Sequence, residues 1–268
     1  MIAYTRLEQE DELEKPGDKD LEKNMWPSRG QIEFVEATMR YRRELEPSIN
    51  QLSFKAQAGM IIGIVGRTGS GKSSILQTLF RLVELQEGHI YIDGVDIKTA
   101  GLHLLRKSIA FIPQSPFLIQ GTIRENLDPF QECTDAQIDA ILREVKMFEK
   151  VYSLDANLNT YVAESNNLFS VGQKQLLCLA RAIIRKTKVL VLDEATANVD
   201  LETDNLIQRT LRERFKNCTV FIVAHRLATI IDADRILVLK EGKLQEYSHP
   251  YKLFVEQEGD KTVTNIKG

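Results

Sequence analysis

The chain has 268 residues, of which 43% are hydrophobic and 27% are charged, and its formal net charge is −3. This length allows one large domain or two small ones, and the composition suits a globular protein with a sizeable core. The slightly acidic balance disfavours nucleic acid as a partner, since nucleic-acid-binding surfaces are usually basic. The apolar runs are too short for a membrane span, and the three cysteines, which form no C-x-x-C pair, are expected to be reduced thiols.

The first thirty residues are predicted to form an acidic linker or tail. Residues Glu8 to Lys23 are nearly all charged around a central Pro16-Gly17 pair, and such a composition cannot bury a core. The early acidic stretch also argues against a secretory leader. We therefore expect residues 1–30 to be solvated and the ordered domain to span residues 31–268.

Strands dominate the first part of that domain. Residues 31–41 have the aromatic and β-branched content of a strand, "INQLSFKAQAG" continues as strand and turn, and "MIIGIVG" is typical of a buried strand. A helix is expected from Lys72 to about Leu82. Another strand with an Asp-Gly turn follows in "GHIYIDGVDI".

Helical patterns replace strands after residue 112. "DAQIDAILREVKMF" has helical spacing, and strand-like runs return only in "KVLVLD", "CTVFIVAH" and "RILVLKEGKLQEY", the last with a Glu-Gly turn that suggests a hairpin. The sequence thus predicts an α/β core at about 31–112 and 176–268, interrupted by a helical subdomain at about 113–175.

A phosphate-binding loop is predicted between the strand "IIGIV" and the helix that follows it. "GRTGSGKSS" fits G-x-x-x-x-G-K-[ST] at Gly66, Gly71, Lys72 and Ser73. Glycines let backbone N–H groups converge on a phosphate, and the helix N-terminus adds a favourable dipole. Lys72 would reach the β- and γ-phosphates and the Ser73 hydroxyl would ligate Mg²⁺. A chance Gly-rich turn is the alternative, and the strand before it and the helix after it argue against that.

Two adjacent acids supply a second part of the predicted site. Asp193 and Glu194 follow the buried strand "VLVL", at the strand end where α/β sheets bind ligands. Asp193 would hold Mg²⁺, and Glu194 could act as the general base on an attacking water. The alternative is a charge pair at a helix N-terminus.

Three further residues are candidates because of their positions. His225 and Gln114 each follow an apolar run and could contact the γ-phosphate, or they could be ordinary structural and loop residues. Tyr41 stands at the end of the first predicted strand, where its ring could stack on an adenine or pack on the core.

The stretch "LFSVGQKQLLCLARAII" predicts an amphipathic helix with a capped start. Ser170 is a good N-cap and Gln173 stands at the capping-box position, while Gly172 leaves room for an anion near the backbone. An ordinary capped helix and an anion site are both compatible with these residues.

Together these motifs resemble the ATP-binding cassette (ABC) ATPases. "GRTGSGKSS", the glutamine at 114, "FSVGQKQ", "VLVLDEAT", "ANVD" and "AHR" occur in that family's order, from about Trp26 to Phe254. "GTIRENLDPF", "GQKQLLCLARAI" and "DEATANVD" look most like the second nucleotide-binding domain of C-subfamily, multidrug-resistance-associated transporters. The resemblance implies an α/β P-loop NTPase (RecA-like) core with an N-terminal antiparallel β region and an inserted α-helical subdomain.

The resemblance also implies ATP and Mg²⁺ as cofactors and assigns roles to matching positions. Catalytic roles fall to Lys72, Gln114, Glu194 and His225, and metal contacts to Ser73, Gln114 and Asp193. Further nucleotide contacts fall to Tyr41, Gly66, Arg67, Thr68, Gly69, Ser70, Gly71, Lys72, Ser73, Ser74, Gln114, Ser170, Gly172, Gln173, Asp193 and Asp200. Asp200 matches the loop aspartate that crosses the dimer interface.

The family signature, usually Leu-Ser-Gly-Gly-Gln, is altered here by Phe169 and Val171. In the family this helix start binds the γ-phosphate of ATP held by the opposite cassette, so the resemblance implies a head-to-tail partner, a first-half nucleotide-binding domain. Because first cassettes of the subfamily often lack the catalytic glutamate, Phe169 and Val171 would complete the partner's poorly hydrolytic site, while Glu194 would serve the hydrolytic one.

The resemblance implies an ATPase that powers export of small, organic-anion or drug-like substrates. The domain would lie on the cytoplasmic face of a membrane, which it would meet only through the transmembrane domains of its transporter. A regulatory nucleotide sensor that gates a channel is the alternative, and Glu194 and His225 favour the motor. A cassette acting on DNA or ribosomes is disfavoured by the acidic balance.

Overall fold

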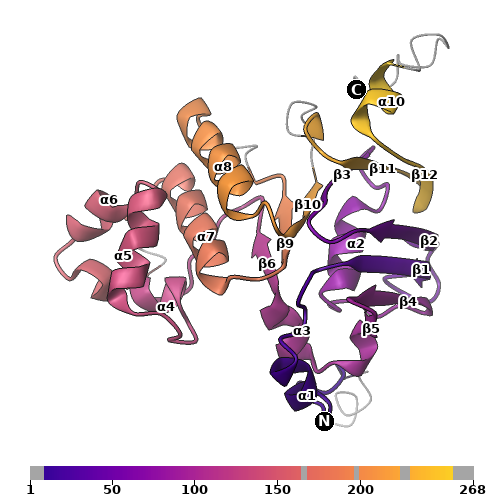
Figure 1. Cartoon of the computed structure of the whole chain (residues 1–268), viewed down its shortest axis with the longest axis horizontal. Helices are drawn as coiled ribbons and strands as arrows, with labels where there is room; N and C mark the ends of the chain where they lie inside the picture. The colour runs from indigo at the N-terminus through magenta and orange to yellow at the C-terminus, as the bar shows by residue number, and fades with distance from the viewer. Residues whose placement is uncertain (1–8, 164–167, 196–198, 224–229, 256–268) are drawn as a thin grey trace.

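The computed structural model describes residues 9–163, 168–195, 199–223 and 230–255 (Figure 1). An antiparallel sheet forms the first part of the fold, in the order β2-β1-β4-β5. Its strands are β1 (Ile32–Met39), β2 (Ile49–Ala56), β4 (Glu87–Ile92) and β5 (Val95–Asp96). Asp93 and Gly94, both with positive φ, form the expected turn between β4 and β5. This sheet confirms the predicted antiparallel β region.

A second sheet carries the parallel strands, in the order β12-β11-β3-β10-β9-β6. Its strands are β3 (Ile61–Gly66), β6 (Ile109–Ile112), β9 (Val189–Asp193), β10 (Thr219–Val223), β11 (Arg235–Lys240) and β12 (Lys243–Ser248). Only β12 runs antiparallel, and it forms the expected hairpin with β11. Because β3, β9 and β6 are parallel, their carboxyl ends meet at one edge of the sheet. The phosphate loop and the acid pair follow these ends.

The described α-helices flank the two sheets or lie at the end of the molecule away from them (Figure 1). They are α1 (Asp18–Lys23), α2 (Lys72–Leu79), α3 (Leu102–Ser108), α4 (Ile123–Leu127), α5 (Asp135–Glu144), α6 (Phe148–Tyr152), α7 (Val171–Arg185), α8 (Leu201–Arg214) and α10 (Pro250–Val255). Figure 1 shows α4, α5 and α6 gathered at one end of the molecule, away from the sheets. They fall within the stretch 113–175, where helical patterns were expected. The short sheet of β7 (Gly121–Thr122) and β8 (Tyr161–Val162) was not predicted.

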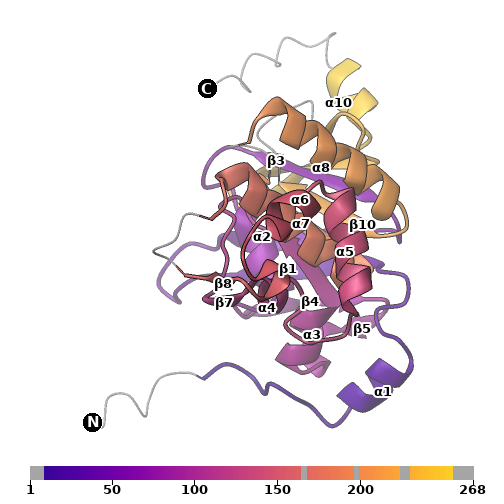
Figure 2. The same cartoon turned by 90° about the vertical axis from the view of Figure 1, so that its left-hand side faces the viewer.

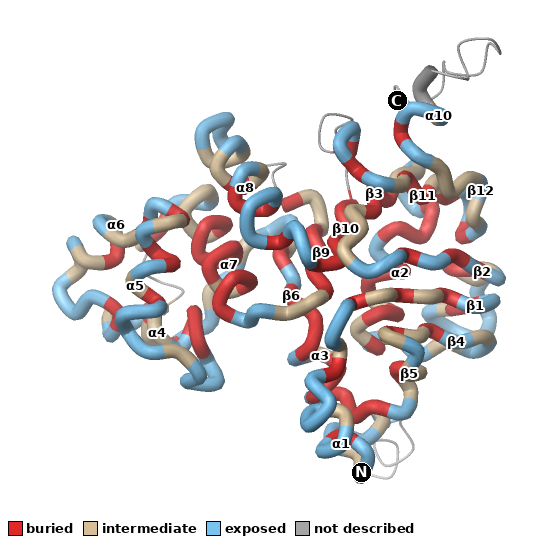
Figure 3. Tube along the Cα trace, in the orientation of Figure 1, coloured by how far each residue is buried: buried red, intermediate tan, exposed pale blue. Residues whose placement is uncertain are grey.

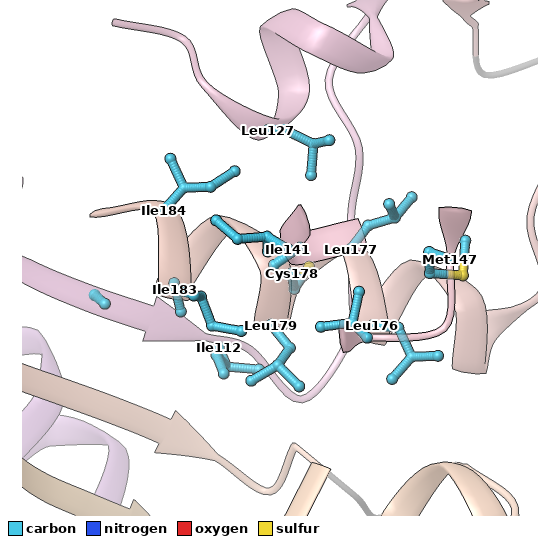
Figure 4. Close-up of a cluster of buried hydrophobic side chains, with 14 of the residues drawn as sticks. Ile112, Leu127, Ile141, Met147, Leu176, Leu177, Cys178, Leu179, Ile183 and Ile184 are labelled. Carbon is cyan, nitrogen blue, oxygen red and sulfur yellow. The ribbon is translucent and has the colours of Figure 1, made fainter. Parts of the chain in front are cut away.

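Two hydrophobic clusters hold these layers together. One joins the antiparallel sheet to β3, α2 and α3. The other joins α4, α5 and α7 to β6 and β9, and Figure 3 shows how much of α7 is buried. In Figure 4 the side chains of Leu179 and Ile183 lie near Ile112 of β6, within this second cluster. No helix in the described ranges is long and apolar enough to cross a membrane.

Most of the described residues from 9 to 23 are exposed, as expected for a solvated stretch, but the segment is also anchored to the domain by side chains that were not predicted to have partners. Asp11 pairs with the buried Arg81 at 2.6 Å, and the Asp18 carboxylate accepts from Gly101 N at 2.8 Å. Figures 1 and 2 both place α1 beside α3. Composition correctly indicated that the segment cannot form a core. Composition does not show that carboxylates of this segment bind the buried Arg81 guanidinium and the backbone N–H of Gly101 at the start of α3.

Candidate functional site

The phosphate loop joins the end of β3 to the start of α2, and at two of its glycines the surrounding backbone leaves no room for a side chain. A Cβ at Gly66 would lie 2.5 Å from the Leu239 carbonyl oxygen, and one at Gly71, whose φ is +102°, would lie 2.4 Å from the Ser48 carbonyl oxygen. Neither carbonyl can move aside without disturbing its own strand or loop. Glycine at these two positions therefore allows the tight curl that exposes backbone N–H groups at the start of α2.

Lys72 begins α2 and folds back into the loop. The residue is buried, and its ammonium donates to the carbonyl oxygens of Gly66, at 2.8 Å, and Arg67, at 3.1 Å. Burial lowers the pKa of Lys72, while the nearby charges of Glu194 and Asp193 oppose that shift. The loop thus holds a cation through neutral carbonyls, beside the two acids of the site.

Several features of the loop fit a phosphate-bearing ligand. The hydroxyl of Ser70 is buried and, among the described residues, has no hydrogen-bond partner. The side of Gly69 on which a Cβ would lie is open, whereas Gly66 and Gly71 are closely packed there. Ser73 is an exposed residue in the first turn of α2. The buried Ser70 hydroxyl, the open space beside Gly69 and the Lys72 ammonium could each contact the triphosphate of ATP.

The acid pair lies at the end of the neighbouring strands. Asp193 is the last residue of β9. The backbone N–H of Glu194 donates to the Val223 carbonyl oxygen at 3.0 Å, and this bond holds Glu194 against the end of β10. Gln114, two residues beyond β6, donates from Nε2 to Glu194 Oε2 at 2.6 Å. The ends of β6, β9 and β10 thereby bring Gln114, Asp193 and Glu194 together.

Tyr41 contacts the phosphate loop rather than the core. It lies two residues beyond β1, and its hydroxyl is 3.0 Å from Ser74 Oγ, while 47% of the residue is exposed. The alternative of a strand aromatic packed on the core is wrong. An exposed ring anchored to the loop by its hydroxyl fits stacking with a nucleotide base.

The donor set of the site also fits Mg²⁺. Within the described ranges, no group of three or more His, Cys, Asp or Glu could hold a metal alone. Mg²⁺ commonly takes one or two carboxylates together with phosphate oxygens and water. The Ser73 hydroxyl, the Asp193 carboxylate and the amide oxygen of Gln114 are oxygen donors of that kind. A triphosphate would supply the remaining ligands.

The cap of α7 has the geometry that its sequence predicts. Ser170 Oγ accepts from Gln173 N at 3.2 Å, and Gln173 Oε1 accepts from Ser170 N at 3.0 Å, which is a complete capping box. Ser170 is exposed, whereas Phe169 is buried. A Cβ at Gly172 would meet Thr203 Oγ1 at 3.4 Å and Asp200 Oδ1 at 3.5 Å, so this turn lies against the start of α8.

Asp200 has a structural role of its own as the N-cap of α8. Its carboxylate accepts from Thr203 N at 3.0 Å and from Thr203 Oγ1 at 2.8 Å. The hydrogen bond from the Thr203 backbone, followed by that from its hydroxyl, lowers the pKa of Asp200.

The predicted site residues therefore form two groups. Tyr41, the phosphate loop, Gln114 and the acid pair meet at the edge of the parallel sheet, whereas Ser170, Gly172 and Gln173 lie with Asp200 where α7 meets α8. In Figure 1 strands of the parallel sheet separate α2 from α7. His225 lies outside the described residues, so its role stays a prediction. Gln175, whose amide donates to the Pro113 carbonyl oxygen in the Gln114 loop, was not predicted, because it stands among apolar residues of α7.

Comparison with known proteins gives a consistent picture. A protein-family model described as "ABC transporter" matches residues 49–197, more than half of the chain. The chain is 51% identical over 234 residues to "ABC transporter C family member 3" of Dictyostelium discoideum, covering 87% of this chain and 17% of that protein. It is 46% identical over 260 residues to "Probable multidrug resistance-associated protein lethal(2)03659" of Drosophila melanogaster, covering 96% of this chain and 19% of that protein.

Solved structures agree with these relatives. The fold matches "Structure of a bacterial Atm1-family ABC exporter with ATP bound" with a TM-score of 0.78 and 32% sequence identity, over 87% of this chain and 41% of that one. The chain spans less than a fifth of the length of the two curated relatives named above.

Proposed function

Since the chain belongs to the ABC transporter family, whose cassette domains are ATPases, we propose that it binds Mg-ATP and hydrolyses it to drive export. The observation that carries this proposal is the bond from Gln114 Nε2 to Glu194 Oε2, which holds a carboxylate beside a phosphate loop. The proposed substrates are small organic anions or drug-like molecules. The similarity to a multidrug-resistance-associated protein supports that choice.

Binding would rest on residues of this chain alone. Lys72 would exchange the carbonyl oxygens of Gly66 and Arg67 for phosphate oxygens, and the backbone N–H groups at the start of α2 would face the same charge. Tyr41 would stack on the adenine while its hydroxyl stays on Ser74. Mg²⁺, when bound, would neutralise charge on the phosphates. Each of these groups lies within one edge of the parallel sheet.

Hydrolysis would depend on Glu194 as the general base. Its carboxylate would accept the proton of the attacking water, and the amide of Gln114 would keep the carboxylate oriented toward the phosphate loop. The contact between Glu194 N and the Val223 carbonyl oxygen anchors the backbone from which that side chain projects. His225 is proposed to orient the same water.

Completion of the site would require a second cassette. The exposed Ser170 and the neighbouring Gly172 form a capped helix start that strands of the parallel sheet separate from this chain's own phosphate-loop helix α2 (Figure 1), which supports a role toward a partner's nucleotide. We infer a head-to-tail pair with a first-half nucleotide-binding domain. Phe169 and Val171 would modify the partner's site, and Glu194 would serve this chain's site.

Contact with transmembrane domains is proposed near the Gln114 loop. Phe111, Phe117 and Phe130 are each at least 38% exposed, and Arg181 lies over the Phe117 ring while Lys107 lies over Phe130. Exposed aromatic side chains near this loop would suit contact with another protein segment. The domain would meet the cytoplasmic face of a membrane through those partners.

Two substitutions test the proposal in the assembled transporter. Glu194→Gln should keep nucleotide affinity and lower turnover by about 10²–10⁴-fold, because a general base is lost. Lys72→Ala should weaken binding itself. Equilibrium binding of ATP and steady-state phosphate release measure the two effects. The same binding and turnover profile for both variants would overturn this division of roles, and full transport by Glu194→Gln would favour a gating sensor.

A further inference from the structure

Gln175 is a polar side chain in a place where the helix otherwise buries apolar ones. It lies on the first turns of α7, is 1% exposed, and is followed by the buried Leu176 and Leu177. Its Nε2 donates to the carbonyl oxygen of Pro113 at 3.1 Å. Its Oε1 is buried and has no hydrogen-bond partner among the described residues. A residue needed only for packing would not carry an amide with one atom left unsatisfied.

The accepting carbonyl belongs to the peptide group that leads into Gln114, the residue proposed to orient Glu194. The Pro113 carbonyl and the Gln114 N–H share one planar peptide unit, so fixing one fixes the other. Gln114 in turn donates to Glu194 Oε2 at 2.6 Å. A continuous path therefore runs from Gln175 through the 113–114 peptide to the proposed general base.

The other end of that path is the cap of α7. Ser170 and Gln173, which form the capping box, lie five and two residues before Gln175 on the same helix. A shift or rotation of this helix start would therefore pull on the Pro113 carbonyl. The buried helix body, packed in the second hydrophobic cluster, lets the first turns move only as part of the helix.

We propose that Gln175 is a positioning residue that ties the cap of α7 to the Gln114–Glu194 pair. Contact of a partner's nucleotide with Ser170 and Gly172 would then be transmitted to the hydrolytic site of this same chain. This inference rests on the proposed function, because it requires that Glu194 acts on water and that the cap acts on a partner.

The first test is Gln175→Met, which keeps the volume and removes the amide. In the full transporter we expect kcat for ATP to fall on the order of tenfold to a hundredfold, with KM nearly unchanged, since binding groups are untouched and only orientation is lost. Ile183→Val, a small core truncation on the same helix, is the matched control and should leave kcat near the wild-type value. Equal losses in both variants would make Gln175 a packing residue only.

The second test is a pH profile of Gln175→Glu. A buried carboxyl has a raised pKa, and only its protonated form can donate to the Pro113 carbonyl oxygen. Turnover of this variant relative to wild type should therefore recover as the pH falls, whereas that of Gln175→Met should not. Parallel profiles for the two variants would contradict the role of the donated hydrogen bond.

A double-mutant cycle separates this inference from the proposed function. If Gln175 acts through Gln114, Gln175→Met should have little further effect on kcat in a Gln114→Ala background. Additive losses would overturn the path. Lys72→Ala reports on the function itself: if it leaves ATP hydrolysis unchanged, the proposed function fails. If it abolishes hydrolysis while Gln175→Met retains the full kcat, only the positioning role fails.

Discussion

Glu194 combines a proposed chemical role with an unfavourable backbone conformation. Its φ is +46°, in the left-handed region that residues other than glycine and asparagine seldom occupy. The bond from its N–H to the Val223 carbonyl oxygen holds the residue there. Strain of this kind is often found at functional sites, because the surrounding structure must impose it. The fold here accepts a cost in backbone energy at the residue proposed as the general base.

A matched pair of substitutions would measure that strain. Glu194→Gly and Glu194→Ala both remove the carboxylate, but only glycine adopts a positive φ freely. The left-handed conformation costs alanine about 1–2 kcal/mol, and the extra chain entropy of glycine costs about 0.5–1 kcal/mol, so Glu194→Gly should be the more stable variant by roughly 0.5–1 kcal/mol. Denaturant unfolding of both variants checks this difference, and a more stable Glu194→Ala would mean that the backbone there is unstrained.

The identities of the site residues were readable from sequence, but their backbone conformations and contacts were not. Asp193 and Glu194 could be assigned because they end an apolar strand, and Lys72 because glycines precede it. Nothing in the sequence indicates that Glu194 is left-handed or that its partner is Gln114, since both depend on which strands become neighbours. The same holds for Gln175, whose partner lies 62 residues away.

Helix α7 shows how one element can serve folding and binding with the same residues. The capping box of Ser170 and Gln173 was predicted from spacing alone and is confirmed. The position of Gly172 against Asp200 and Thr203 was not predictable, because α8 approaches from a later part of the chain. That contact matters for any test, since an acidic residue at 172 would also face the Asp200 carboxylate.

Gly172→Ala therefore distinguishes the two interpretations of the cap better than a charged substitution. The new Cβ would make contacts of 3.4–3.5 Å with α8, and alanine favours the helix by about 1 kcal/mol over glycine. We expect unchanged or slightly raised stability and unchanged ATP binding by this chain. ATP-driven closure with the partner cassette should weaken, because the methyl group intrudes where the partner's phosphate is proposed to bind.

Ser170→Ala is the complementary variant at this helix start. It should lower stability by about 0.5–2 kcal/mol through loss of the cap. Thermal unfolding of this chain and cassette closure in the full transporter are the two measurements. If Gly172→Ala lowers ATP affinity of this chain and spares closure, the cap acts within the chain and the proposal for a partner fails.

At the scale of the molecule, the N-terminal segment is part of the folded body. The carbonyl oxygens of Glu12 and Leu13 accept from Leu102 N and His103 N, which are the first N–H groups of α3. Hydrogen bonds from Arg81 and then Lys15 hold the pKa of the Asp11 carboxyl well below its usual range. The segment thus links α1 to α3 and to the end of the phosphate-loop helix α2.

This linkage predicts a pH dependence of stability. Because the pKa of Asp11 is lower in the folded state, its contribution is present above its unfolded pKa of about 4 and is lost as the pH falls through the folded value. Asp11→Asn should reduce the free energy of unfolding by on the order of 1 kcal/mol at pH 7, allowing for solvent screening. The difference from wild type should shrink in acid.

Urea unfolding at pH 7 and pH 3 checks this, with Glu10→Gln as the control. Glu10 pairs with Arg106 in a more exposed position, 57% accessible at its side chain, so its loss should have a much smaller effect. Equal effects at positions 10 and 11, or no change with pH, would show that the segment is only loosely held.

The strand order of the parallel sheet determines how late the nucleotide site can fold while the chain is being synthesised. β3 and β9, which carry the phosphate loop and the acid pair, are joined only through β10. β10 is the last of the three to leave the ribosome, and at typical elongation rates it follows β3 by roughly ten to thirty seconds. The antiparallel sheet can pair early from local segments, but the nucleotide site cannot assemble until residue 223 has emerged. A nascent chain that stalls before β10 would expose the unpaired edges of two apolar strands, and we expect it to depend on chaperones for that interval.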